Sequence, residues 1–394
     1  MEGSKVSFVL HPLLVAGLLS LGVAIGCGYD VPSGFDTTVA VGPSAIVTEN
    51  NGLVWVHQAS GDVSSNGGPL TCTGAAVADP DAQYDSATDR WFFTSFDGDG
   101  GIALAVTVGA TPLAPYACYR LASALFNGIT DQPRLSVTAN KVSITPQAGD
   151  SSVTLVINKA DAVAGVSLHT ARVTHSLVFR PARNVTGEGQ LYLVGHASNR
   201  LLRIKVVTGV PGTSDPVMVA SADTNVTFDL TSGTIPDATD PSGVQYHDSL
   251  ISRTMHAVEV YGILYTLTQT VEDGIGKLGI AQVYDLIAPF APKTLQLFTV
   301  APPDQAAGGI GIVCPAIAAT PDHDLVIGFS AASPIHYLSI YATGRHVGDG
   351  FDTLRPPRAV KFGAPWVFPP AGGPFGSTIA TPSLRQTSER WCSG

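Results

Sequence analysis

The densest group of side chains that could do chemistry lies between residues 246 and 256. Tyr246, His247 and Asp248 are consecutive, and Arg253 and His256 follow shortly after them. An imidazole that a carboxylate orients can act as a general base, but adjacent residues of a strand point to opposite faces of its sheet. We therefore expect loop residues at the inner end of a sheet, with binding rather than catalysis as their role. The binding candidates are His247, Asp248, Arg253 and His256.

A second candidate is the glycine-rich acidic turn Asp97-Gly98-Asp99-Gly100. Its carboxylate and carbonyl oxygens could wrap a calcium ion, because the glycines permit a tight turn. The turn lacks the further alternating Asp or Asn and the distal Glu of a calcium-binding loop. A hairpin turn is the simpler interpretation, and Ca²⁺ held by Asp97 and Asp99 is the alternative. No other cofactor is expected.

Other motifs that carry chemistry are absent from the sequence. It contains no Gly-x-Ser-x-Gly, no phosphate-binding loop and no dinucleotide fingerprint. Glycoside hydrolysis needs a pair of carboxyl groups, and the chain is poor in glutamate. The glutamates in its body are Glu49, Glu188, Glu259 and Glu272. We therefore predict no catalytic residue.

The N-terminus has the features of an export signal. Lys5 precedes a long apolar run, and Ala24-Ile25-Gly26 places small residues before Cys27, as a signal peptidase requires. The same stretch resembles a bacterial lipobox, in which the cysteine is acylated. We expect a lipoprotein-type signal peptide over residues 1–26, an acylated Cys27 and a short tether over 27–36. Plain secretion and an uncleaved anchor are the alternatives.

The remaining cysteines are few and widely spaced. Cys72 and Cys118 lie 46 residues apart and flank a strand-rich stretch. Export makes disulfides possible, so we predict a bond between these two; a pair of buried thiols is the alternative. No Cys-x-x-Cys and no Cys/His cluster at zinc spacing occurs in the sequence.

The composition narrows the class of protein. The chain has 394 residues, of which 13% are charged, and it contains 42 glycines and 28 prolines. A soluble domain usually carries about 25% charged residues. The formal net charge of −10 argues against a nucleic-acid partner, which requires a basic surface. Because 45% of the residues are hydrophobic, the chain can bury a large core.

Short apolar runs, separated by Gly, Pro, Asp and Asn, predict many short strands over residues 37–363. One phrase recurs among them: a proline, an alternating strand, a polar turn and a stronger apolar strand. A spacing of roughly 40–50 residues per four-stranded unit is typical of a β-propeller. Copies of the phrase begin at Pro80, Pro133, Pro181 and Pro315, and degenerate copies span 39–49 and 252–269.

These repeats predict an all-β fold, a β-propeller of six to seven blades. Neighbouring blades would bury both faces of each strand, which explains the low charged fraction. A pair of β-sandwiches and a β-helix are the alternatives. Residues 364–394 are rich in Gly and Pro with little strand pattern, so we expect an irregular tail there.

Three stretches resemble a family of exported bacterial β-propeller proteins described as sialidase-like or uncharacterised. They are framework motifs, so the resemblance implies the fold and carries over no catalytic residue. In that family, a phrase similar to Arg390-Trp391 begins a further blade. The resemblance therefore implies, as an alternative, a propeller that is incomplete at its C-terminus. The stretches run from Asp79-Pro80 to Arg90-Trp91-Phe92, from Pro315-Ala316-Ile317-Ala318 to Gly328-Phe329-Ser330 and then from Tyr341 to Arg345, and over Val39-Ala40-Val41-Gly42-Pro43.

The loops around the central channel of a propeller form polar sites for ligands. We therefore expect a binding or scaffold module for glycan or protein partners. It would be a monomer that is either anchored in the cell envelope through lipid on Cys27, its only membrane contact, or secreted. One alternative is an extracellular polysaccharide hydrolase or lyase with its site in the channel. Another is a truncated, non-functional product.

Overall fold

The computed structural model describes most of residues 37–363. The predicted signal peptide, Cys27, the tether and the Gly/Pro-rich tail lie outside the described residues, as do His247, Asp248 and Arg253. Among the described residues, no helix is long and apolar enough to cross a membrane. The residues not described are 1–36, 51–52, 59–62, 67–71, 73–76, 114, 129, 147–152, 199, 228–237, 244, 247–253, 273–274, 285, 287–289, 302–310, 351 and 364–394.

The described strands form six blades of four antiparallel strands, which we number 1 to 6 in chain order; the sheet of one blade gains a short fifth strand that is described below. Blade 1 holds β1 (Thr37–Val41), β2 (Ala45–Asn50), β3 (Leu53–Gln58) and β4 (Val63–Asn66). Blade 2 holds β5 (Val77–Asp85), β6 (Arg90–Asp97), β7 (Gly101–Thr107) and β8 (Tyr116–Leu121). Blade 3 holds β9 (Arg134–Val137), β10 (Lys141–Thr145), β11 (Val153–Asn158) and β12 (Thr170–Thr174).

The second half of the chain repeats this arrangement. Blade 4 holds β13 (Phe179–Pro181), β15 (Leu191–Ser198), β16 (Leu201–Thr208) and β17 (Met218–Asn225). Blade 5 holds β20 (Thr254–Val260), β21 (Ile263–Glu272), β22 (Ile275–Tyr284) and β23 (Lys293–Val300). Blade 6 holds β24 (Gly311–Ala319), β25 (Leu325–Ser333), β26 (His336–Arg345) and β27 (Arg358–Lys361).

Five smaller elements complete the described part of the chain. The short strand β14 (Arg183–Asn184) follows β13 and pairs in parallel with β20, so it ties blade 4 to blade 5. β18 (Ala238–Thr239) and β19 (Gln245–Tyr246) form a small separate hairpin. The 3-10 helix η1 (Ser123–Phe126) follows blade 2, and the helix α3 (Lys159–Ala164) lies between β11 and β12.

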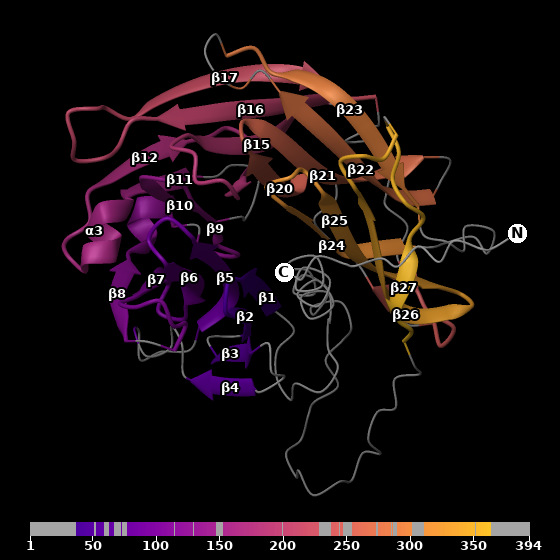
Figure 1. Ribbon diagram of the computed structural model, residues 1–394, viewed down its shortest axis with the longest axis horizontal. Coiled ribbons are helices and arrows are strands. Elements are labelled where there is room, and N and C mark those ends of the chain that lie inside the picture. Colours follow the sequence, from indigo (N-terminus) through magenta and orange to yellow (C-terminus); the bar gives the residue numbers. More distant parts are fainter. Residues whose placement is uncertain are drawn as a thin grey trace, which may run out of the picture.

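The blades follow one another around a ring in chain order (Figure 1). The first strands of successive blades contact one another, from β1 to β5, β9, β13, β20 and β24, and so form the innermost layer. The molecule is therefore an all-β six-bladed β-propeller, which confirms the fold class predicted from the repeats. The two-sheet and β-helix alternatives are wrong.

The core consists of layers between neighbouring blades. On β6, Phe92 packs in a cluster with residues of blade 3, and the adjacent Phe93 packs in a cluster with residues of blade 1. Both side chains are fully buried. Similar clusters join blades 3 and 4, 4 and 5, and 5 and 6. Strands buried on both faces leave little room for charge, which accounts for the composition.

The repeated prolines mark the innermost strand of their blades. Pro80 lies in β5, Pro181 in β13 and Pro315 in β24, and Pro133 immediately precedes β9. Proline has no N–H to donate to a ladder, so sheets accept it at edges and at strand starts. An innermost strand is such an edge, because its free side faces the central channel.

Candidate functional site

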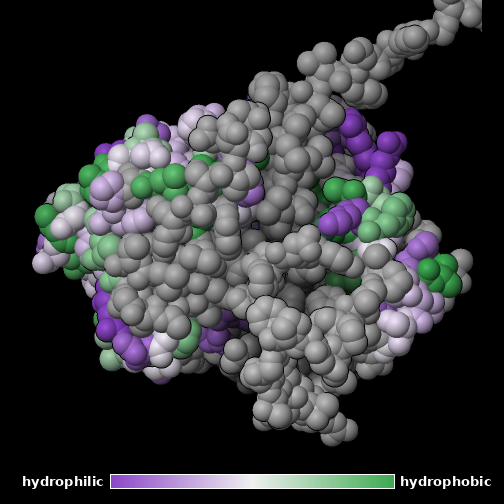
Figure 2. All heavy atoms as spheres, turned by 90° about the horizontal axis from the view of Figure 1, so that it is seen from below, coloured by the Kyte–Doolittle hydropathy of each residue, from purple (hydrophilic) through white to green (hydrophobic). Residues whose placement is uncertain are grey.

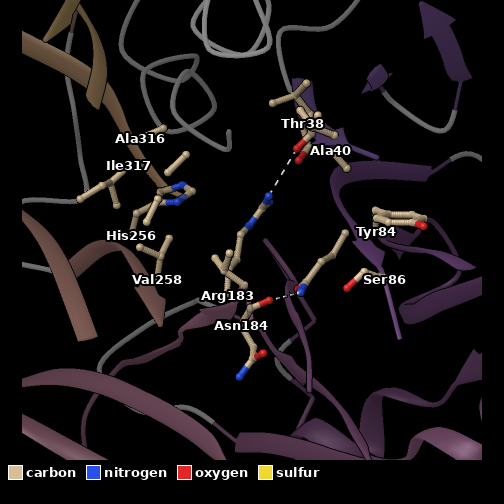
Figure 3. Close-up of a pocket in the computed structure, with 16 residues that line it drawn as sticks. Thr38, Ala40, Tyr84, Ser86, Arg183, Asn184, His256, Val258, Ala316 and Ile317 are labelled. Atoms are coloured by element: carbon tan, nitrogen blue, oxygen red, sulfur yellow. Dashed lines mark hydrogen bonds between the residues drawn. The ribbon is translucent and has the colours of Figure 1, made fainter. Parts of the chain in front are cut away.

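The channel holds a cavity of about 300 Å³ lined by the innermost strands β1, β5, β20 and β24 and by β14. Its walls are largely small and apolar, as at Val39, Val258 and Ile317. Polar groups enter it from several strands. They belong to Gln83, Tyr84, Ser86, Arg183 and His256. Figure 3 shows His256 on one side, Tyr84 and Ser86 on the other, and Arg183 between them.

Arg183 on β14 is the central charged group of this cavity. Its Nη1 donates a hydrogen bond to the carbonyl oxygen of Val39 at 3.3 Å. Its Nη2 donates a hydrogen bond to the carboxylate of Asp81, with which it forms an ion pair. The guanidinium therefore links the inner strands of blades 1 and 2 to β14, and its side chain remains 25% exposed.

Asp81 on β5 is buried and held ionised. Its Oδ2 accepts a hydrogen bond from the backbone N–H of Leu135 at 2.8 Å, and its Oδ1 accepts one from the Thr38 hydroxyl at 3.3 Å. Burial by itself would raise the pKa of Asp81. Arg183 and Arg134, with smaller contributions from the Leu135 N–H and from His256, outweigh burial, so the pKa of Asp81 is lowered.

A smaller cavity, of about 20 Å³, adjoins the same carboxylate. It brings together guanidinium groups from three inner segments: Arg134 on β9, Arg180 on β13 and Arg183 on β14. Arg134 and Arg180 are only 6% and 3% exposed. His256 lines this cavity as well as the larger one, so Arg183 and His256 stand where the two cavities meet.

Of the four residues that the sequence singled out as ligand-binding candidates, the structure describes one. His256 lies on β20 and lines the channel. The other three, His247, Asp248 and Arg253, lie outside the described residues, so their role stays a prediction.

Sequence reasoning missed the charged residues of the channel. Asp81 and Arg134 each follow directly after a repeated proline. Arg180 directly precedes another, Pro181, and Arg183 lies two residues after it. The signal was therefore present: a charged residue adjoins the repeat proline in three successive blades. Because that proline marks the strand at the channel, its neighbours are the residues to examine first.

The acidic turn between β6 and β7, which the sequence suggested as a candidate calcium site, is paired with an arginine. Arg120 Nε donates a hydrogen bond to Asp97 Oδ2 at 2.5 Å, and its Nη2 donates one to Asp99 Oδ2 at 2.6 Å. Asp97 is fully buried there. The turn forms the β6–β7 hairpin, and a cation at this position would have to displace the guanidinium. Within the described residues, no three His, Cys, Asp or Glu side chains are grouped closely enough to hold a metal.

Cys72 and Cys118 form a disulfide, with the sulfur atoms 2.05 Å apart. This is the pair predicted from the sequence. Cys118 lies on β8, the outermost strand of blade 2, and Cys72 precedes β5, the innermost strand. The bond therefore fastens the segment that enters blade 2 to the outer edge of the same blade.

Comparisons with known proteins add likenesses of structure only. The sequence matches no protein-family model, and no curated protein matches it. Among solved structures, the chain is similar to the Aleuria aurantia lectin in complex with alpha-methyl-L-fucoside, with 11% identity, a TM-score of 0.40, and 84% and 98% of the two chains covered. It is also similar to a thermostable family-43 glycoside hydrolase, with 13% identity, a TM-score of 0.35, and coverage of 88% and 100%.

A third similar structure is an endo-1,4-beta-xylanase from Bacteroides thetaiotaomicron, with 10% identity, a TM-score of 0.36, and coverage of 83% and 97%. These similarities are too low to transfer a function. The propeller is established by the strand pairing of this chain, and its function has to be inferred from the residues of its own channel.

Proposed function

We propose that the protein is a binding module that holds a glycan in its central channel. The observation that carries this proposal is the cavity of about 300 Å³ in which apolar walls meet the polar groups of Arg183, His256 and Ser86. Small-molecule sites combine apolar lining with a few placed polar groups, and their volumes begin at about 300 Å³. A cavity of this size suits the end of an oligosaccharide rather than a long stretch of polymer.

The surface supports a glycan better than a protein partner. Protein interfaces are marked by extended apolar patches. On the described parts of the face in Figure 2, hydrophilic and hydrophobic residues are intermixed. The large exposed hydrophobic side chains lie on different blades, as at Val108, Met218 and Ile335.

Hydrolysis of a polysaccharide is less well supported than binding. A glycosidase needs two carboxyl groups, one of them able to donate a proton. Among the described residues that line the two cavities, Asp81 is the one carboxylate, and it is ionised and paired with Arg183. Glu49 is fully buried and lines neither cavity.

We also propose that the module is exported and tethered to the cell envelope by lipid on Cys27. The support is the small-residue sequence that precedes this cysteine. Globomycin treatment should then make the unprocessed precursor accumulate, and Cys27→Ala should release the protein from the membrane fraction. Unchanged processing and fractionation in both experiments would contradict the lipid anchor.

The glycan proposal is tested by blocking the cavity. Ser86 lies at the exposed wall of the cavity, so Ser86→Trp should obstruct it. Ser214→Trp, in an exposed turn before β17, is the matched control. Binding is screened with a library of neutral and acidic oligosaccharides, and the hits are measured by calorimetry. We expect Ser86→Trp to weaken binding at least about tenfold, which is about 1.4 kcal/mol, and Ser214→Trp to leave it unchanged. Absence of any hit, or equal affinities for the two variants, would overturn the proposal.

A further inference from the structure

Basic side chains gather at the smaller cavity of the channel, although the chain as a whole is acidic. The chain carries a formal net charge of −10. The smaller cavity is lined by three guanidinium groups, one imidazole and one carboxylate, the side chains of Arg134, Arg180, Arg183, His256 and Asp81. With the imidazole counted as neutral, these described lining residues carry two positive charges more than negative ones. A local excess of one sign concentrates ligands of the opposite sign.

The carboxylate within this lining is already engaged by the protein. Asp81 Oδ1 accepts hydrogen bonds from the Thr38 hydroxyl, the Ala82 N–H and Arg183, and its Oδ2 accepts one from the Leu135 N–H. An arginine side chain has five N–H donors. Contacts of Arg183 within the described part of the chain account for two of them. Donors of Arg183 therefore remain for a ligand in the cavity that it lines.

The two cavities are arranged so that one ligand can use both. The larger cavity has room for a sugar ring, whereas the smaller one, at about 20 Å³, has room for little more than one water-sized group. Arg183 and His256 stand at their junction. A sugar in the larger cavity would therefore direct a small charged substituent toward the guanidinium groups.

We infer that the channel is specific for a carboxylate-bearing sugar, such as the uronic acid residue at the end of an acidic oligosaccharide; this inference rests on the proposed glycan binding. A carboxylate matches the fork of a guanidinium, which can donate two parallel hydrogen bonds to it. The guanidinium groups are placed by β9, β13 and β14, so strand pairing and burial fix their positions before a ligand arrives. The carboxylate lies at Arg183 and His256, and the neutral part of the sugar lies against the apolar walls.

The test uses one sugar skeleton with and without its charge. Wild-type protein is titrated by calorimetry with an oligogalacturonide and with its methyl ester, which keeps the ring and removes the negative charge. We expect the acid to bind about ten- to a hundredfold more tightly than the ester, the range for one hydrogen bond to a charged group. Equal affinities for acid and ester would overturn the carboxylate inference and leave the glycan proposal standing. If the screen yields no glycan at all, the proposed function itself fails.

Variants then locate the carboxylate. Arg183→Lys keeps the positive charge and the ion pair with Asp81 but loses the fork, and it should lower the preference for the acid over the ester about tenfold. His256→Gln should also lower this preference. Arg203→Gln, which alters an exposed guanidinium on β16, is the matched control and should keep the full preference. A full preference in both channel variants would contradict the assignment. Because the acid-to-ester ratio is measured on folded wild-type protein, the inference can fail even if a variant does not fold.

Discussion

Arg183 donates a charged hydrogen bond to Asp81, which lies 102 residues earlier in the chain and on a strand of another blade. The two residues do not belong to one local sequence motif. The fold brings them together because β14 pairs with β20 at the inner layer, where Arg183 lies within hydrogen-bond distance of Asp81 on β5. The pair stabilises the inner layer and at the same time presents a guanidinium to the cavity.

The first prediction concerns this ion pair. Asp81→Asn should destabilise the protein by about 3–5 kcal/mol, because it removes the partner of a partly buried guanidinium. The lowered pKa of Asp81 means that its contribution is present above the ordinary carboxyl pKa and is lost as the pH falls through the folded-state value. The wild type should therefore lose more stability than the variant on acidification. Chemical denaturation of both proteins at several pH values between 3 and 7 measures the difference. If the unfolding free energies of the wild type and the variant fell in parallel with decreasing pH, this account would be contradicted.

A second prediction compares a buried ion pair with an exposed one. Lys159 Nζ lies 2.9 Å from Asp85 Oδ2, and both side chains are at most 6% exposed. Lys159→Met leaves the carboxylate buried without its charge partner and should cost about 3–5 kcal/mol of unfolding free energy. Arg203→Met breaks the exposed pair with Asp223 and should cost less than about 1 kcal/mol.

Urea denaturation of these two variants decides the comparison. In the double variant Lys159→Met/Asp85→Asn, part of the lost stability should return, because the uncompensated charge is gone. A similar cost for the buried and the exposed pair would show that burial does not control the energy of these interactions.

Glu49 provides a third prediction, with the opposite pH dependence. Its carboxyl is fully buried, and neither oxygen has a hydrogen-bond partner among the described residues. Burial, and then the nearby Asp81, raise the pKa of Glu49 well above its usual value. The folded protein keeps this proton while the unfolded chain releases it, so the contribution of Glu49 is present at low pH and is lost as the pH rises.

Glu49→Gln, a neutral substitute of similar shape, should therefore be more stable than the wild type at pH 8, and the gain should shrink toward pH 4. The exposed Glu188→Gln is the control and should show no such trend. Thermal unfolding across this pH range checks the prediction. A Glu49→Gln variant that is less stable than the wild type at pH 8 would contradict it.

A fourth prediction concerns acid sensitivity between blades 3 and 4. His175 Nδ1 lies 2.8 Å from Lys205 Nζ, and its Nε2 lies 2.8 Å from the Thr154 hydroxyl. Burial, and then the charge of Lys205, lower the pKa of His175 to about 3. The neutral imidazole thus stabilises the fold fully above pH 6.5, and this contribution is lost as the pH falls toward 3.

The loss should be on the order of 1 kcal/mol per pH unit. His175→Gln removes the titrating group, so it should flatten the fall in unfolding free energy between pH 6 and 4. His169→Gln, which alters an exposed imidazole, should keep the wild-type slope. An unchanged slope in His175→Gln would contradict the role of this residue.

The fold could be predicted from the sequence because each repeat shows the strand pattern that a blade requires. A strand buried on both faces must be apolar throughout, and the innermost strand tolerates proline because one of its edges is free. Pro80, Pro181 and Pro315 therefore located three innermost strands directly. The number of blades was harder to fix, because long insertions separate the later copies of the phrase.

Most residues of the candidate site could not be predicted from the sequence. Arg134, Arg180 and Arg183 belong to different inner segments, and the packing of neighbouring blades brings them to one carboxylate. The pairing of Arg120 with Asp97 and Asp99 depends on how β8 lies beside the β6–β7 hairpin, which composition does not reveal. His256 became a candidate because it belongs to a dense polar cluster in the sequence. The structure places it on β20 at the channel, and its role in binding stays a prediction.

The most direct measurement of the central claim is a crystal structure of the protein with a bound oligogalacturonide. The account predicts that one sugar ring occupies the cavity between β1, β5, β20 and β24. It also predicts that the carboxylate of this ring accepts hydrogen bonds from the Arg183 guanidinium, beside His256. A sugar bound on the outer surface, or one whose carboxylate points away from Arg183, would contradict the account.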